Sequence, residues 1–173
     1  RSASTGDAPV RVCLDVDASL RIGPIHLGVR RSPLREPAAV AALAARARQR
    51  GFSVAGVMFY EAQIAGLPDT SAPIGWVKKA SARELASRRG AVVATVTDAV
   101  GALEIVNSGG TGSLEVSSAD PVVTEVTAGS GLYVPTLFDR YRAFRPDPAL
   151  FFALSAVRKP TPSVTTLDRK SVV

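Results

Sequence analysis

Cysteine and histidine are almost absent from this chain of 173 residues, which contains one of each, Cys13 and His26. A single cysteine excludes an intramolecular disulfide framework, and with one histidine it cannot complete the four ligands of a structural zinc site. The sequence has no run of about 18 apolar residues, which excludes a membrane-spanning helix. Because no signal peptide is visible either, the cytoplasm is the expected location.

Aromatic residues make up only 6% of the chain, although its net charge is +6. The basic residues are scattered or form short clusters, at 30–31, 46–50, 78–79 and 88–89. Most clusters lie on predicted helices or at their ends, where a solvated surface explains them. No aromatic residue is interleaved with them, as a platform for stacking bases requires. The composition disfavours nucleic-acid binding and describes a globular protein with a core of its own.

The pattern along the chain alternates strands and helices. An alternating run at 10–16 predicts a strand, and a helix follows over 36–50, with Pro37 in its first turn and Gly51 as its cap. The remaining elements are strands at 52–60, 103–107, 122–126 and 150–158, a long helix at 74–100, and short helical pieces at 111–116 and 135–141. This alternation is typical of β/α units around a parallel sheet, and four units make half of a (β/α)8 barrel of about 250 residues.

Both ends of the sequence are unlike those of a natural protein. The chain begins at Arg1, and residues 168–173 resemble a sequencing-library adapter translated in one frame, with an ordinary frayed tail as the alternative. We therefore expect an internal fragment, with a partial barrel over 1–148, the start of a C-terminal β domain over 149–167 and a non-native tail over 168–173. Half a barrel leaves two sheet edges open, so this piece is expected to be unstable and inactive.

Two loops rich in glycine and hydroxyl groups follow predicted strands. One covers 108–113 after the apolar run 103–106, and the other covers 128–131 after the strand at 122–126. Backbone N–H groups and small hydroxyls in such loops converge on anions, as in a phosphate cradle. We therefore expect a cofactor phosphate between neighbouring strand ends, with plain turns as the alternative.

Five segments carry a resemblance to a known family. They occur in the family's order and together cover nearly all of residues 10–167, at 13–17, 26–33, 56–61, 106–113 and 124–139. The chain resembles the fold-type III pyridoxal phosphate (PLP) enzymes of the alanine-racemase N-terminal-domain superfamily, within it the D-threonine aldolase, D-serine dehydratase and amino-acid deaminase group. The resemblance implies strands five to eight of the barrel, followed by the first strand of the C-terminal domain.

The resemblance also implies which residues bind the cofactor. The PLP phosphate would be held after strand seven by Ser108, Gly109, Gly110 and Thr111, and after strand eight by Gly129 and Ser130. Tyr60 falls where the family places an aromatic residue or a histidine against the pyridine ring, and a tyrosine packed under a loop is the alternative. Asp15 and Asp17 are either carboxylates of the pocket or caps of the loop that follows them.

Two positions depart from the racemase pattern. His26 stands where the racemases have an arginine that reaches the phenolic oxygen of the ring, a task that Arg21 or Arg30 could also perform. Thr127 replaces an arginine that faces the pyridine nitrogen, and a hydroxyl there changes how strongly the ring withdraws electrons. This difference argues against a plain alanine racemase.

The lysine that carries PLP in this family lies upstream of Arg1. None of the lysines present falls at a predicted strand end, so we nominate no catalytic residue among Lys78, Lys79, Lys159 and Lys170. The metal ligands of the aldolase and dehydratase members would lie beyond Leu167. Any divalent metal would therefore be bound by residues of the C-terminal domain.

The leading hypothesis is a PLP-dependent lyase in its intact form, acting on D-amino acids or 3-hydroxy amino acids by deamination or retro-aldol cleavage. The run at 30–33 resembles the amino-acid deaminase branch most closely, and family members are commonly homodimers. Two alternatives stay open: a non-catalytic PLP-binding barrel of PLP homeostasis, or an unrelated barrel that binds a phosphorylated metabolite.

Overall fold

The computed structural model describes residues 8–142 and 145–168, so most of the predicted adapter-derived tail lies outside the described residues. The elements run in the order β1 (Arg11–Val16), β2 (Leu20–Ile22), β3 (Ile25–Leu27), α1 (Pro37–Gln49), β4 (Ser53–Phe59), α2 (Ala62–Ala65), α3 (Ala72–Val100), β5 (Ile105–Ser108), the 3₁₀ turn η1 (Thr111–Ser113), α4 (Leu114–Ser118), β6 (Glu125–Val126), the 3₁₀ turns η2 (Gly129–Leu132) and η3 (Thr136–Phe138), β7 (Ala156–Thr161) and β8 (Val164–Leu167). Among the described residues no helix combines the length and apolar character that a membrane span requires.

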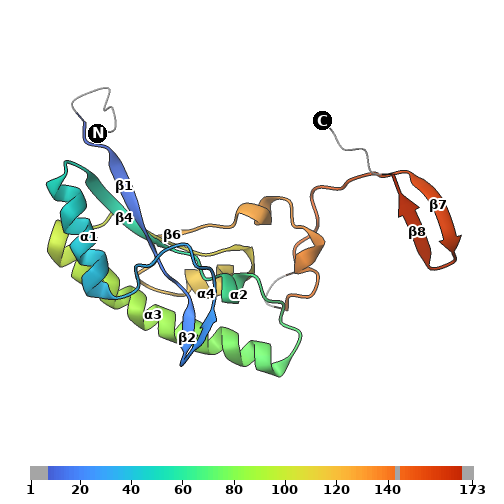
Figure 1. Ribbon diagram of the computed structural model, residues 1–173, viewed down its shortest axis with the longest axis horizontal. Helices are drawn as coiled ribbons and strands as arrows, with labels where there is room; N and C mark the ends of the chain where they lie inside the picture. The colour runs from blue at the N-terminus through green and yellow to red at the C-terminus, as the bar shows by residue number, and fades with distance from the viewer. Residues whose placement is uncertain (1–7, 143–144, 169–173) are drawn as a thin grey trace.

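Four strands form one parallel sheet in the order β1-β4-β5-β6. Helix α1 lies between β1 and β4 in the chain, and α2 and α3 lie between β4 and β5, as in successive β/α units (Figure 1). The predicted mixed α/β class with a parallel sheet is confirmed. The numbering of these strands as five to eight of a barrel stays a prediction.

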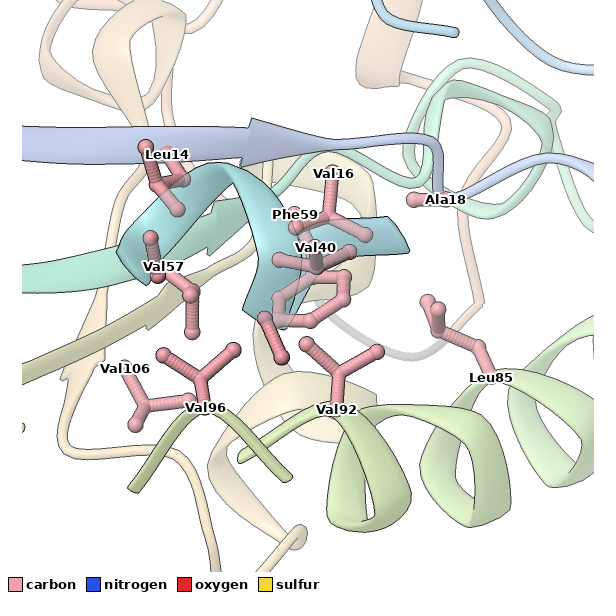
Figure 2. Packing of buried hydrophobic residues seen from close by; sticks show 12 residues of the cluster. Leu14, Val16, Ala18, Val40, Val57, Phe59, Leu85, Val92, Val96 and Val106 are labelled. Carbon is pink, nitrogen blue, oxygen red and sulfur yellow. The ribbon is translucent and has the colours of Figure 1, made fainter. Parts of the chain in front are cut away.

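The apolar core lies between the sheet and the helices α1 and α3. It takes every second residue of β1, β4 and β5 together with side chains of both helices (Figure 2): Leu14, Val16, Val57, Phe59, Val106, Val40, Leu85, Val92 and Val96. Because strand side chains alternate between faces, Asp15, Met58 and Asn107 share the opposite face, where they pair in register. One face of the sheet is therefore packed, and the strand ends carry the polar residues described below.

Five short elements were not predicted: the strands β2 and β3 of one hairpin, α2, the 3₁₀ turn η2 and β8. The predicted strand at 150–158 is also wrong in its bounds, because β7 covers Ala156–Thr161 and pairs with β8. Pro160 fits inside β7 because each strand of a two-stranded hairpin has a free edge that needs no N–H donor. Every residue of this hairpin is exposed, and it stands apart from the rest of the chain in Figure 1. The domain boundary at 149 stays a prediction.

Candidate functional site

The loops that follow β5 and β6 lie side by side at the carboxyl edge of the sheet. The side-chain nitrogen of Asn107 donates to Thr127 Oγ1 at 2.6 Å, and the hydroxyl oxygens of Thr111 and Ser130 are 2.6 Å apart. The backbones approach as closely, because the Thr127 N–H donates to the carbonyl of Ser108 at 3.0 Å. Candidate residues from both glycine loops therefore meet in one place.

Gly109 permits this close approach of the two loops. Its φ of +115° is a conformation that L residues rarely adopt, and a Cβ added there would lie 2.9 Å from the carbonyl oxygen of Thr127. The next residue, Gly110, faces an aromatic ring instead. A Cβ at Gly110 would lie 3.0 Å from Cε2 of Tyr60 and 2.7 Å from Cβ of Ala65. Tyr60 thus lies against the β5 loop, and its predicted place beside the pyridine ring stays a prediction.

Backbone N–H groups at the starts of η1 and η2 are further candidate donors. The first hydrogen bond inside η1 runs from the Ser113 N–H to the Gly110 carbonyl, and the first inside η2 from Gly131 to Ala128. Four N–H groups precede these bonds and have no partner within their own turns, those of Thr111, Gly112, Gly129 and Ser130. A Cβ added at Gly129 would meet no described atom within 4 Å, so the space beside it is open.

A buried carboxylate lies behind the β5 loop. Glu61 is fully buried and accepts hydrogen bonds from the hydroxyls of Ser108 at 3.0 Å, Ser113 at 2.8 Å and Ser117 at 2.5 Å. The Gly109 N–H points to the same carboxylate at 3.4 Å. Glu61 was not among the predicted site residues. Ser108 was predicted to hold the phosphate; its hydroxyl contacts Glu61 and Arg89, and the assignment stays a prediction.

Arg89 links this carboxylate network to the end of α4. Its guanidinium donates to Ser108 Oγ at 2.8 Å, forms a short ion pair with Asp120 and lies over the ring of Phe59, 5.2 Å from the centroid. The side chains of the ion pair are only 4% and 6% exposed. The interpretation of the 88–89 cluster as a solvated helix surface is therefore wrong, because the side chains of Arg88 and Arg89 are only 9% and 4% exposed.

The two acidic residues at the end of β1 have different environments. Asp17 is buried, accepts hydrogen bonds from the Ser19 N–H at 3.0 Å and the Ser19 hydroxyl at 2.9 Å, and pairs with Arg21 at 2.7 Å. It therefore caps the loop that follows β1, one of the two predicted alternatives. Asp15 is partly exposed and lies 3.3 Å from Arg31.

Asp17 makes the stability of the fold depend on pH. Burial alone would raise the pKa of Asp17, but the hydrogen bonds from Ser19 and Arg21 outweigh it, and the pKa is lowered from its ordinary value of 3.8. A lowered pKa stabilises the folded state above the ordinary value, and the contribution is lost as pH falls through the folded-state pKa. In urea titrations, Asp17→Asn should therefore cost more stability at about pH 6 than at about pH 3. Equal losses at both pH values would contradict this account.

His26 lies in the β2–β3 hairpin, where its Nε2 is 3.4 Å from the Val29 carbonyl oxygen. With Arg21, Arg30 and Arg31 it lines a pocket of about 510 Å³. Arg31 connects this pocket to the aromatic candidate, because its guanidinium carbon lies 5.1 Å from the ring centroid of Tyr60. These contacts of His26 stay within residues 21–33, so its predicted place at the phenolic oxygen stays a prediction.

Lysines and metal ligands do not gather at this edge within residues 8–142 and 145–168. Lys78 and Lys79 lie on α3 and Lys159 lies on β7, while Lys170 falls outside the described residues. Lys78 is buried and pairs with Asp69 at 2.6 Å. The described residues also contain no group of three or more histidine, cysteine and acidic side chains placed to hold a metal ion.

Solved structures that share this fold include an aldolase and a dehydratase. D-threonine aldolase from Filomicrobium marinum matches 94% of the chain with a TM-score of 0.75 and 19% sequence identity. D-threo-3-hydroxyaspartate dehydratase from Delftia sp. HT23 matches 73% of the chain with a TM-score of 0.50 and 20% identity. The chain spans 41% and 30% of these two proteins, and no protein-family model and no curated protein matches its sequence. The fold is the one that the resemblance of the five segments implied.

Proposed function

We propose that this chain forms the phosphate side of the cofactor site in a PLP-dependent lyase that acts on D-amino acids or 3-hydroxy amino acids. The observation that carries the proposal is the meeting of the two glycine loops at the carboxyl edge of the sheet, where Thr111 and Ser130 are in hydrogen-bond contact. Its support from the sequence is the ordered set of five motifs. Its support from comparison is a fold shared with an aldolase and a dehydratase.

The donor set fits the phosphate of PLP. Backbone N–H groups from two neighbouring turns, together with the hydroxyls of Thr111 and Ser130, offer neutral donors to a dianion without needing a lysine. Side chains at Gly109 and Gly110 would collide with their neighbours, as expected where backbone forms the cradle. The Tyr60 ring packed beside Gly110 offers an aromatic face to the cofactor ring.

When bound, PLP supplies a carbonyl that condenses with the substrate amino group and a ring that withdraws electrons from it. The chain's own residues bind and orient that group. Thr111 and Ser130 hold the phosphate end, and Tyr60 restricts the ring. The Thr127 hydroxyl accepts a hydrogen bond from Asn107 at 2.6 Å, so its own proton remains for the pyridine nitrogen. A hydroxyl in place of the racemases' arginine changes how strongly the ring withdraws electrons, which argues against a plain alanine racemase.

The full-length protein is expected to take up PLP as an imine, visible as an absorption band that borohydride abolishes. Thr111→Val and Ser130→Ala each remove one hydroxyl and should weaken PLP binding about tenfold, the effect of one hydrogen bond to a charged group. Ser118→Ala, which alters an exposed serine outside the cradle, is the matched control.

Turnover is then tested with D-threonine, D-serine and D-3-hydroxyaspartate by detecting the carbonyl product. Product formation from any of them supports the lyase. An imine band without turnover of these substrates or other D-amino acids would point to PLP storage instead. Binding of inorganic phosphate with no imine band would overturn the proposal in favour of a barrel for a phosphorylated metabolite.

A further inference from the structure

Glu61 contacts the β5 loop through the serine side chains of that loop. It directly follows Tyr60 at the end of β4 and is fully buried. Its two carboxylate oxygens accept from three serine hydroxyls spread along the loop and the helix behind it, those of Ser108, Ser113 and Ser117. The Gly109 N–H is a fourth, longer contact. A single carboxylate thus joins the end of β5, the 3₁₀ turn η1 and helix α4.

This contact explains how a loop with two consecutive glycines keeps one shape. Glycine pairs have little conformational preference of their own, so the fold must hold them in place. Glu61 binds the chain on both sides of the pair, at Ser108 and Ser113. Because the serine hydroxyls are directed to Glu61, Thr111 alone of the loop hydroxyls meets the neighbouring loop, at Ser130.

Arg89 brings a positive charge to the network around Glu61. The Arg89 guanidinium donates to Ser108 Oγ at 2.8 Å, and the same hydroxyl donates to Glu61 at 3.0 Å. Arg89 also pairs with Asp120, so the network extends from β4 through β5 to the end of α4. Buried polar networks rigidify the segments that they connect as their members find partners, and of the atoms in this network only Arg89 Nε is buried without a hydrogen-bond partner among the described residues.

We infer that Glu61 is a positioning residue for the phosphate loop, a role that rests on the proposed PLP site. Glu61 does not touch the phosphate. It holds the loop so that the donors of Thr111 and the neighbouring N–H groups face the other loop, as outer-shell carboxylates orient the ligands of metal sites. Removing it should therefore weaken recognition of the phosphate selectively and leave recognition of the pyridine ring unchanged.

The test compares the dissociation constants of PLP and of pyridoxal, which lacks the phosphate, for the full-length protein by absorbance titration. Glu61→Gln keeps the size of the side chain, but its amide cannot accept from all of these donors. It should weaken PLP binding about tenfold, the lower range for outer-shell partners, and leave pyridoxal binding unchanged. The control is Glu115→Gln on α4, an exposed acidic residue close in sequence to the same loop, which should change neither constant.

Comparing PLP with pyridoxal distinguishes a failure of the role of Glu61 from a failure of the proposed phosphate site. Equal weakening of both ligands, or no change in either, would overturn the role of Glu61. A wild-type protein that binds PLP no better than pyridoxal would overturn the proposed phosphate site itself. If Glu61→Gln does not fold, Ser117→Ala removes only one of the contacts to Glu61 and should give a smaller, selective loss of about threefold. A loss shared equally by both ligands in this variant would contradict the inference as well.

Discussion

Replacing Arg89 with methionine is expected to lower the free energy of unfolding by about 3–5 kcal/mol, the usual cost of removing one partner of a buried ion pair. Asp120 would lose its ion-pair partner while its side chain is only 6% exposed. Ser108 would lose the guanidinium that donates to its hydroxyl, and the contact with the ring of Phe59 would disappear. Urea denaturation of the wild-type and variant chains measures the difference.

The matched control is a solvent-exposed ion pair of the same protein. Arg11 and Glu104 form a pair in which the side chains are 57% and 62% exposed. Arg11→Met should cost no more than about 1 kcal/mol, because solvent and salt screen exposed pairs. A cost for Arg89→Met as small as that for Arg11→Met would mean that Arg89 is solvated. The buried network behind the β5 loop would then not exist as described.

The succession of strands and helices was predictable because most elements carry their own signals. The alternation around Leu14 and Val16 marks β1, and Pro37 and Gly51 bound α1. The β2–β3 hairpin has three residues per strand, too few for an alternating pattern to stand out. Strand β7 was misplaced for another reason: the apolar run at 150–154 suggests a strand, but the observed strand is set by its pairing with β8, which involves two irregularities of register.

The meeting of the two loops was predictable from topology, whereas the partner of the first loop was not. Parallel strands that are neighbours end at one edge, so loops after β5 and β6 must be close. Strand alternation already places Ser108 with Val106 on the helix side, and Ser113 and Ser117 are four residues apart, as residues on one helix face are. Those signals indicate hydroxyls directed inward. That Glu61 receives them depends on the packing of α2 against η1, which no local pattern contains.

The burial of Arg89 also could not be predicted from the local sequence. The sequence shows two adjacent arginines on a long helix, and a solvated face is the ordinary explanation of such a pair. The structure separates their roles: Arg88 bonds to Glu84 one turn away and to the Asp17 carbonyl, while Arg89 enters the core beside Phe59. The burial of Arg89 depends on its partners Ser108 and Asp120, and both belong to later segments of the chain.

A methyl group at position 109 is expected to weaken PLP binding about 100-fold, because displacing the loop removes two hydroxyl contacts to the phosphate at about tenfold each. The backbone of Gly109 has a φ of +115°, which alanine adopts only with strain. The new Cβ would also lie 2.9 Å from the carbonyl oxygen of Thr127, which is backbone and cannot rotate away. The β5 loop must therefore move away from the β6 loop and separate Thr111 from Ser130. PLP titration of Gly109→Ala in the full-length protein measures the effect.

Two other glycines show whether the loss comes from this displacement. A Cβ at Gly90 in α3 meets nothing within 4 Å, so Gly90→Ala should leave PLP binding unchanged and stabilise the helix by about 0.5–1 kcal/mol. A Cβ at Gly129 also meets open space and leaves the two loops in contact. A loss in Gly129→Ala would therefore mean that the open space beside it is where the phosphate lies. If Gly109→Ala bound PLP as the wild type does, the β5 loop would not depend on its contact with Thr127, and the juxtaposition that carries the proposed function would lose its basis.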